Sequence, residues 1–270
     1  MNDLSRYGFD FAPTGALTVE RVNWVRHWNE YLFSFAVTRP ASFRFRSGEF
    51  VMLGLPANGR PLLRAYSIAS ASYADELEFL SIKVPDGPLT SRLCQIQPGD
   101  PLYLGRKPTG TLVADALTPG SRLFLLSTGT GLAPFLSIAR DPEIYDRFGQ
   151  VVLAHCARTV AGLAYRTELE SQLAGDPLVQ DQALLQFHYV PTVTREAFRT
   201  TGRLGALIDS GRLFDPLSGP ALLDPATDRV MLCGSMGMIH DLASRLEALG
   251  FEEGSNANLG AYVIERAFVD

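Results

Sequence analysis

The pattern of apolar residues changes near Pro119, and this change most constrains how the chain can fold. Before it, between about Leu17 and Leu112, short β-rich runs alternate with turn residues. Such spacing is typical of a compact antiparallel sheet that closes into a barrel. After it, continuous apolar runs are each followed by a turn and a helical pattern. That order is typical of a doubly wound parallel sheet of about five strands.

The first part of the chain is expected to hold six strands and one short helix. The strands are expected within 17–28, 31–38, 49–56, 66–70, 77–84 and 101–105, and the helix over 91–96. In the second part, strands are expected within 122–127, 151–156, 184–190, 229–234 and 261–268, and helices within 134–140, 162–174 and 238–250. The connection over 107–121 carries two prolines and two glycines. It predicts a two-domain division into residues 1–115 and 116–270.

Composition excludes several classes of protein. An apolar content of 46% in 270 residues can fill a core in each of two domains, which excludes a disordered chain. A net charge of −5 argues against a nucleic-acid-coating protein. The three cysteines form no C-x-x-C pair, and no apolar run reaches the roughly 18 residues of a membrane span. We therefore expect a cytoplasmic protein without a metal, a membrane partner or a nucleic-acid partner.

Two glycine-rich turns follow apolar strands in the second part. Thr128-Gly129-Thr130-Gly131 leads into a helix that carries Pro134, and Cys233-Gly234-Ser235 follows a later strand. Glycines let backbone N–H groups approach a phosphate, and the carboxyl ends of parallel strands share one edge of the sheet. The two turns therefore predict one ligand crevice. Taken alone, the first turn is equally consistent with a tight turn that binds nothing, and Cys233 with a small buried apolar side chain.

A third pattern lies in the barrel half of the chain. Arg64-Ala65-Tyr66-Ser67 is followed by Ser81-Ile82-Lys83, and then by a Gly-Pro-Leu-Thr-Ser turn over 87–91. A Tyr between an Arg and a Ser supplies an aromatic face, a guanidinium for a diphosphate and a hydroxyl for a ring nitrogen. The alternative is an edge strand whose Arg extends into solvent.

In this order and spacing, the Arg-x-Tyr-Ser barrel and the Thr-Gly-Thr-Gly-x-Ala-Pro sheet resemble the ferredoxin-NADP reductase superfamily. The runs RAYSIAS, SIKVPDGPLTSRL, GTGLAPF, VPTVTRE and YVIERAFVD look like the bacterial ferredoxin(flavodoxin)-NADP reductases of the FPR type. The resemblance covers nearly the whole chain. It implies an FAD-binding β-barrel followed by an α/β domain that binds NADP(H).

The resemblance implies that FAD lies on the barrel. Arg64 would bind its diphosphate, Tyr66 would stack on the isoalloxazine and Ser67 would hydrogen-bond flavin N5. Ala267 would lie on the flavin face where nicotinamide enters, and Phe268 against the adenine. The implied FAD residues are Arg64, Ala65, Tyr66, Ser67, Ser81, Ile82, Lys83, Leu89, Thr90, Ser91, Thr130, Ala267 and Phe268.

The resemblance also implies a nicotinamide site at the two glycine turns, with Cys233 and Glu265 near the reacting carbon. Tyr66, Ser67, Cys233 and Glu265 are thus the expected catalytic positions. For the 2′-phosphate of NADP, Arg195 with Thr194 after one strand, and Arg203 beyond it, are suitably placed. Arg158, after another strand, is a candidate for the adenosine side, and a solvated surface position is the alternative for each arginine. The implied NADP residues are Gly129, Gly131, Pro134, Arg158, Thr194, Arg195, Arg203, Cys233, Gly234 and Ser235.

The implied reaction is hydride exchange between NADP(H) and FAD, followed by single-electron transfer with ferredoxin or flavodoxin, in which the flavin supplies the chemistry. Two other functions stay open. One is an NAD(P)H-dependent reductase component of an oxygenase system, or a flavin reductase of the same superfamily. The other is a regulatory subunit that keeps FAD without using nicotinamide. A monomer is expected because two domains bury their own faces. Four isolated histidines show no ligand spacing.

Overall fold

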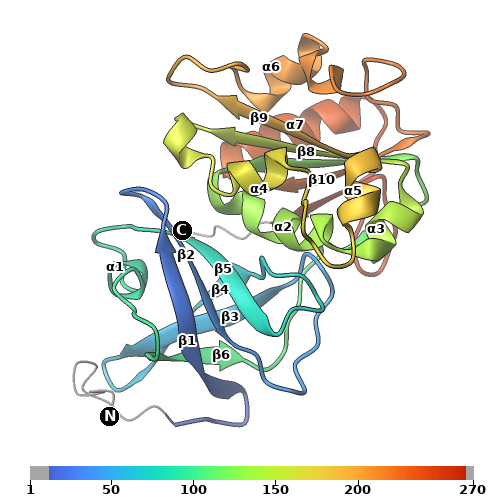
Figure 1. Cartoon of the computed structure of the whole chain (residues 1–270). Coiled ribbons are helices and arrows are strands. Elements are labelled where there is room, and N and C mark those ends of the chain that lie inside the picture. The colour runs from blue at the N-terminus through green and yellow to red at the C-terminus, as the bar shows by residue number, and fades with distance from the viewer. Residues whose placement is uncertain (1–11, 266–270) are drawn as a thin grey trace.

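Two sheets lie one above the other in the computed structural model, which describes residues 12–265 (Figure 1). One is antiparallel with six strands and the other parallel with five, as the two sequence patterns predict. The antiparallel strands are β1 (Leu17–His27), β2 (Leu32–Thr38), β3 (Phe50–Ala57), β4 (Arg60–Ser67), β5 (Glu76–Ile82) and β6 (Pro101–Gly105). The parallel strands are β7 (Arg122–Thr128), β8 (Gln150–Ala157), β9 (Phe187–Val193), β10 (Asp228–Cys233) and β11 (Tyr262–Glu265).

The antiparallel sheet closes on itself through its two edge strands. Its order is β4-β3-β6-β1-β2-β5, and β4 packs against β5 across the opening. Just after β4, Ile68 forms an antiparallel bridge with Phe79 of β5. Phe33, Phe35 and Phe79 are fully buried inside the barrel. Each contributes about 1.5–3 kcal/mol of burial free energy. Closure also brings residues of β4 and β5 onto one surface.

The parallel sheet has the order β11-β10-β7-β8-β9 and separates two cores. On β7, Leu123 and Leu125 enter one core, and Phe124 and Leu126 enter the other. Because both faces are covered, the strand is a continuous apolar run. Helices α2 (Ala133–Ala139), α3 (Pro142–Arg147), α4 (Arg166–Glu170) and α5 (Gln180–Gln186) cover the first face. Helices α6 (Leu204–Asp209) and α7 (Met236–Ala248) cover the second.

The predicted strand over 66–70 is wrong in its position. β4 begins at Arg60, because it forms a hairpin with β3 through Asn58 and Gly59. Both turn residues have positive φ, of 49° and 76°. Asn-Gly is the preferred pair for a two-residue hairpin turn whose central residues are both left-handed. The sequence therefore carried a signal for this hairpin that the strand pattern alone did not reveal.

The elements before β9 also differ from the prediction. The apolar run 184–190 was expected to form one strand, but Leu184 and Leu185 belong to α5, and β9 begins two residues later. Both leucines are exposed, at 64% and 79% of their surface, so they do not belong to a buried strand. The predicted helix over 162–174 is mostly irregular and contains only α4. It cannot begin earlier, because Tyr165 takes a left-handed φ of 58°.

Tyr165 joins the two domains. Its hydroxyl lies 2.5 Å from the Ser34 hydroxyl on β2 and also bonds to the Glu78 carboxylate on β5. The Trp28 indole donates to the same Ser34 oxygen at 2.7 Å, and Arg140 lies 3.8 Å from Glu78. Burial raises the pKa of Glu78 and the pKa of Tyr165. Since buried polar groups stabilise a structure only when they are paired, this network favours one relative orientation of the two domains.

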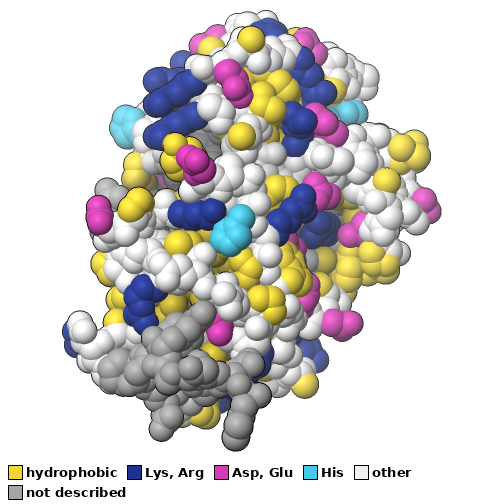
Figure 2. All heavy atoms as spheres, turned by 60° about the vertical axis from the view of Figure 1, so that its left-hand side comes forward, with side chains coloured by type: hydrophobic (Ala, Val, Ile, Leu, Met, Phe, Trp, Pro, Cys, Tyr) yellow, Lys and Arg dark blue, Asp and Glu magenta, His cyan; other side chains and the backbone are white. Residues whose placement is uncertain are grey.

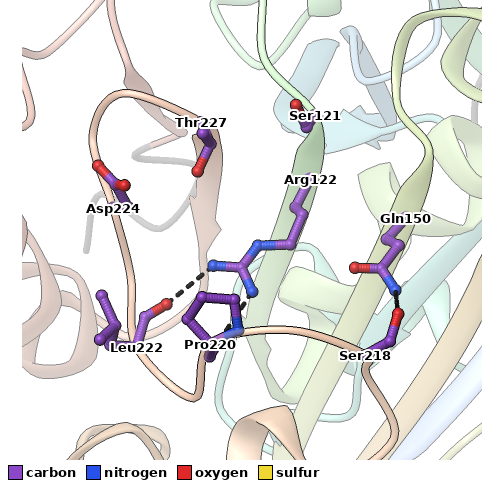
Figure 3. Close-up of a pocket in the computed structure, with 8 residues that line it drawn as sticks. All are labelled: Ser121, Arg122, Gln150, Ser218, Pro220, Leu222, Asp224 and Thr227. Carbon is purple, nitrogen blue, oxygen red and sulfur yellow. Dashed lines mark hydrogen bonds between the residues drawn. The ribbon is translucent and has the colours of Figure 1, made fainter.

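At the amino-terminal edge of the parallel sheet, Arg122 and Asp228 form a buried ion pair. They are the first residues of β7 and β10. Two guanidinium nitrogens lie 2.6 Å from the two carboxylate oxygens. Figure 3 shows the same guanidinium reaching the carbonyls of Pro220 and Leu222, at 3.1 and 2.8 Å. Removing one partner of such a pair costs about 3–5 kcal/mol. The pair therefore holds the loop that leads into β10.

Candidate functional site

The two glycine turns meet at the carboxyl edge of the parallel sheet. β7 and β10 are neighbours, with Ser127 opposite Cys233. After β7 the chain enters the 3-10 turn η3 (Gly129–Leu132) and then α2. The Thr128 hydroxyl accepts a hydrogen bond of 2.9 Å from the N–H of Ser235. The structure thus brings together the two turns, as the sequence predicts, at the edge where doubly wound sheets bind ligands.

Only glycine fits where these turns touch. A Cβ atom on Gly131 would lie 2.2 Å from the carbonyl oxygen of Cys233. A Cβ atom on Gly234, whose φ is +154°, would lie 2.2 Å from the Thr128 hydroxyl oxygen. Pro134 is buried in the first turn of α2, where a missing N–H costs no helical hydrogen bond. We call the two turns that meet at Gly131 and Gly234 the glycine cradle, and a glycine-rich turn that leads into a helix suits a diphosphate.

Cys233 and Glu265 are adjacent in the register of β10 and β11, so their side chains share one face of the sheet. Cys233 is fully buried, and Glu265 is 7% exposed. Burial, with the nearby Glu265 carboxylate, raises the pKa of Cys233 far above its usual range. The thiol is therefore neutral, which excludes a nucleophilic thiolate. A Cβ atom on Gly110 would lie 3.1 Å from Glu265 Oε2, so this carboxyl group reaches the connection between the domains.

Two of the predicted arginines lie side by side after neighbouring strands. Arg158 follows β8 and Arg195 follows β9. The N–H of Arg195 donates to the carbonyl of Arg158 at 2.9 Å, and the N–H of Thr194 donates to the carbonyl of Ala157 at 3.1 Å. These bonds extend the pairing of the two strands by two residues. They place Arg158 and Arg195 after the carboxyl ends of their strands, on the same edge of the sheet as the glycine turns.

Arg203 lies on this rim too, directly before α6, on a segment that bridges to the end of β9. Arg158, Arg195 and Arg203 are exposed, and none forms an ion pair with a carboxylate of residues 12–265. Arg199, in contrast, pairs with Glu170 at 2.8 Å. Figure 2, which brings this side of the molecule forward, shows Lys and Arg side chains gathered on its upper part. Unpaired guanidinium groups of this kind suit a phosphate.

On the barrel, Tyr66 of β4 and Ser81 of β5 meet where the sheet closes. The Ser81 hydroxyl donates to the Tyr66 hydroxyl at 3.4 Å. The Tyr66 ring packs edge-on against Phe35 and Phe79 and is only 9% exposed. Burial raises the pKa of Tyr66, so its hydroxyl stays neutral. Arg64, two residues earlier on β4, is exposed.

The other predicted FAD residues of β4 and β5 differ in exposure. Ser67 lies opposite Phe50 and is 9% exposed, and Ala65 is half-buried. Ile82 is exposed. The Lys83 ammonium donates to the carbonyl of Asn29 at 2.7 Å, so it holds the β1–β2 loop. Of these residues, Ile82 is the most exposed, and the contacts of all of them with FAD stay predictions.

The predicted helix after β5 is the single turn α1 (Thr90–Leu93). Leu89 is 2% exposed and packs in the barrel core. The Ser91 hydroxyl donates to the carbonyl of Gly87 at 2.7 Å, and the Thr90 hydroxyl to that of Val84 at 3.3 Å. Both hydroxyls therefore close the turn in this structure. Their contact with FAD stays a prediction.

Thr130 lies in η3, which packs against β5. The second domain therefore reaches the barrel at β5, and the contact of Thr130 with the flavin stays a prediction. Ala267 and Phe268 lie outside the described residues, so their roles also stay predictions.

His155 is a site residue that the sequence analysis missed. It is fully buried at the carboxyl end of β8, and its Nε2 lies 3.2 Å from the carbonyl oxygen of Gly129. Its Nδ1 lies 3.4 Å from the Tyr189 hydroxyl. Burial lowers the pKa of His155 to about 4. A lone histidine in an apolar run gives no pattern that would have revealed this contact.

The described part of the chain holds no group of three or more His, Cys, Asp or Glu side chains suited to a metal ion. Among its helices, none has the length and apolar character needed to cross a bilayer. A cavity of about 330 Å³ lies around Arg122, at the amino edge of the parallel sheet. That arginine is already bonded to Asp228 and to two carbonyls. The cavity is therefore part of the structure that holds the loop before β10, which Figure 3 shows.

Two family models match the chain: the Oxidoreductase FAD-binding domain over residues 18–113 and the Oxidoreductase NAD-binding domain over residues 125–244. Ferredoxin–NADP reductase A of Sorangium cellulosum is 53% identical over 251 residues, which are 93% of this chain and 90% of that protein. The flavodoxin/ferredoxin–NADP reductase of Rhodobacter capsulatus is 51% identical over 260 residues, or 96% of each chain. A crystal structure of a ferredoxin NADP+ reductase from Neisseria gonorrhoeae with bound FAD and NADP superposes with a TM-score of 0.85, at 32% identity, over 94% of this chain and 100% of that one.

A closed barrel that matches an FAD-binding model, followed by a parallel sheet that matches an NAD-binding model, defines a two-domain flavoprotein oxidoreductase. FAD and a nicotinamide dinucleotide are its cofactors. The chain belongs to the ferredoxin–NADP reductase family, which confirms the resemblance seen in the sequence.

Proposed function

We propose that the protein exchanges hydride between NADP(H) and FAD and exchanges single electrons with ferredoxin or flavodoxin. One observation carries this proposal: the glycine cradle at Gly131 and Gly234 shares a rim with three exposed arginines that form no ion pair within residues 12–265. NADP differs from NAD by a 2′-phosphate, and guanidinium groups bind phosphate with paired hydrogen bonds. The relatives named as ferredoxin and flavodoxin/ferredoxin reductases support this class of carrier.

We assign residues 1–115 to FAD and residues 116–270 to NADP(H). The last barrel strand ends at Gly105 and the first parallel strand begins at Arg122, so the division falls in the connection between them. The ends of the two matching family models, at 113 and 125, support it. Each domain buries its own core, which favours a monomer.

The barrel surface fits a flavin. Arg64 is exposed for the diphosphate, and the Tyr66 ring is held by Phe35 and Phe79 in one orientation for the isoalloxazine. The Ser67 hydroxyl is the donor for flavin N5. When bound, FAD converts between hydride transfer and single-electron transfer. The remaining residues proposed to line FAD are Ala65, Ser81, Ile82, Lys83, Leu89, Thr90, Ser91, Thr130, Ala267 and Phe268.

The parallel sheet fits the dinucleotide. The turn from Gly129 to Pro134 and the turn from Cys233 to Ser235 hold its diphosphate through the N–H groups that remain, since Pro134 has none and that of Ser235 is bonded to Thr128. The neutral Cys233 thiol and the Glu265 carboxyl group border the nicotinamide at its reacting carbon. Their task is positioning, since a fixed near-attack geometry lowers the barrier without a side-chain nucleophile. The residues proposed for the 2′-phosphate side are Arg158, Thr194, Arg195 and Arg203.

Two measurements test the proposal. The purified protein should carry or take up FAD, shown by flavin absorbance, and that absorbance should bleach faster with NADPH than with NADH under anaerobic conditions. Cytochrome c reduction should then depend on added ferredoxin or flavodoxin. Absence of FAD binding would contradict the assignment of the barrel. A preference for NADH without reduction of either carrier would favour an oxygenase reductase or a flavin reductase instead.

A further inference from the structure

His155 connects the inside of the parallel sheet to the first glycine turn. It lies on β8, fully buried, and Tyr189 on the neighbouring β9 approaches its other side. The carbonyl of Gly129 can only accept a hydrogen bond, so Nε2 must carry the imidazole hydrogen. In a neutral imidazole the other nitrogen is then an acceptor, and Tyr189 donates to it. The three groups form one directed chain of hydrogen bonds.

The protonation states agree with that direction. Burial lowers the pKa of His155 to about 4, so the ring is neutral near pH 7. Burial also raises the pKa of Tyr189, so its hydroxyl keeps the proton that it donates. A neutral ring with a donor on one side holds a single tautomer.

His155 restrains Gly129 in addition to the 3-10 turn that this glycine begins. Its φ is +56°, and glycine has the greatest backbone freedom of any residue. A Cβ atom on Gly129 would meet nothing within 4 Å, so no packing holds the outer side of this turn. Because a peptide unit is planar and trans, a carbonyl held toward His155 directs the N–H of Thr130 the opposite way, out of the turn.

We propose that His155, oriented by Tyr189, is a positioning residue for the nicotinamide dinucleotide: it fixes the Gly129–Thr130 peptide so that the Thr130 N–H faces the diphosphate. The inference rests on the proposed function, in which this turn holds the dinucleotide. Through this chain of hydrogen bonds, a side chain inside the sheet sets the affinity of a site that it does not touch.

Three variants separate this role from simple support of the fold. His155→Phe keeps a ring but removes both hydrogen bonds, and Tyr189→Phe removes only the outer partner. His155→Gln retains an amide that can both donate and accept. His188→Phe, on β9 outside the turn, is the matched control. Each protein is loaded with FAD, and its Kd for NADP+ is measured by difference absorbance, with FAD content and melting temperature recorded alongside.

His155→Phe should raise the Kd for NADP+ about tenfold and Tyr189→Phe about threefold, the range expected for one lost hydrogen bond. His155→Gln should stay within about threefold of the wild type, His188→Phe should match it, and FAD content should not change. In steady state, KM for NADPH should rise more than kcat falls.

Folded, FAD-loaded Tyr189→Phe and His155→Phe proteins with the wild-type Kd would overturn the inference. If the His155→Phe protein does not fold, the Kd of the Tyr189→Phe protein for NADP+ tests the inference by itself. Wild-type protein that binds FAD but no NADP+ would overturn the proposed function, and this inference with it. The wild-type titration therefore distinguishes the two failures.

Discussion

Thr128 and Ser235 are 107 positions apart in the chain, and one hydrogen bond of 2.9 Å joins the Thr128 hydroxyl to the Ser235 N–H. Ser235 also caps α7, because its hydroxyl accepts from the N–H of Met238 at 3.4 Å. The end of β7, the end of β10 and the start of α7 are thus linked through two side-chain hydroxyls. We expect the two halves of the cradle to move as one unit.

Thr128→Val keeps the shape of the side chain and removes the acceptor for Ser235. We expect the free energy of unfolding to fall by about 1 kcal/mol and KM for NADPH to rise about threefold to tenfold, because the second turn loses its tie to the first. Urea denaturation and steady-state kinetics measure the two effects. Thr118→Val, which loses a bond of 3.2 Å to the carbonyl of Gly260, should lower stability without raising KM. Equal KM changes in both variants would contradict the linkage.

Gly131→Ala places a methyl group 2.2 Å from the backbone of Cys233, which cannot move aside as a flexible side chain can. The two turns must separate, so we expect a stability loss of about 1–3 kcal/mol and a Kd for NADP+ that is at least about tenfold weaker. Gly149→Ala is the control, since its new atom would meet its nearest neighbour at 3.8 Å. A Gly131→Ala protein that binds NADP+ normally would show that the close approach is not needed.

Arg195→Ala should raise KM for NADPH far more than KM for NADH, because only NADPH carries the 2′-phosphate. Parallel steady-state assays with the two dinucleotides measure the ratio. Arg199→Ala removes a nearby arginine that is already paired with Glu170, so it should change neither KM. If Arg195→Ala affects both dinucleotides equally, the assignment of Arg195 to the 2′-phosphate is wrong.

Arg64→Ala should weaken FAD binding about tenfold, because charge-assisted hydrogen bonds to a diphosphate contribute about 1.5–3 kcal/mol. The measurement is the Kd of FAD for the apoprotein, followed by fluorescence quenching. Arg60→Ala supplies a control on the same strand, at an exposed position next to the hairpin turn. Loss of the same affinity in both variants would point to general attraction by positive charge rather than to a contact at Arg64.

His155 makes stability depend on pH. Its pKa is about 4 in the folded protein and 6.5 in an unperturbed histidine, so below pH 6.5 the unfolded state takes up a proton that the folded state does not. The free energy of unfolding should therefore fall by about 2 kcal/mol between pH 7 and pH 5 through this residue alone. This contribution should be absent from the His155→Gln protein, so its free energy of unfolding should fall by about 2 kcal/mol less between the two pH values, which urea titrations can show. His27 and His188, whose pKa burial also lowers, contribute equally to both proteins. Identical slopes would contradict the buried, neutral state of the ring.

The sequence predicted the two sheets and the meeting of the glycine turns because both depend on periodic or topological rules. Strands in which apolar residues alternate with polar ones indicate a sheet with one buried face, and continuous apolar runs indicate a sheet that is buried on both faces. Once the second sheet is taken as parallel, the turns after Thr128 and Cys233 must lie on one edge. No individual side-chain contact was needed for that inference.

The remaining features depend on tertiary contacts that no local pattern encodes. The left-handed backbone of Tyr165 is held by partners on the other domain, Ser34 and Glu78, so helix propensity around it gave the wrong boundary. The role proposed for His155 depends on a carbonyl 26 positions away. Leu184 and Leu185 were assigned to a strand because hydrophobicity was taken as burial, which the structure contradicts.

The closure of the barrel has a consequence for the life of the polypeptide in the cell. Six of the residues proposed to hold FAD come from β4 and β5, the strands at the two ends of the sheet order: Arg64, Ala65, Tyr66, Ser67, Ser81 and Ile82. A chain whose barrel is open would therefore present only part of the flavin surface. Because a ligand that binds only the native state stabilises it in proportion to the logarithm of its concentration, flavin supply would set the folded population. Riboflavin starvation should then shorten the half-life of this protein against proteases before it limits catalysis.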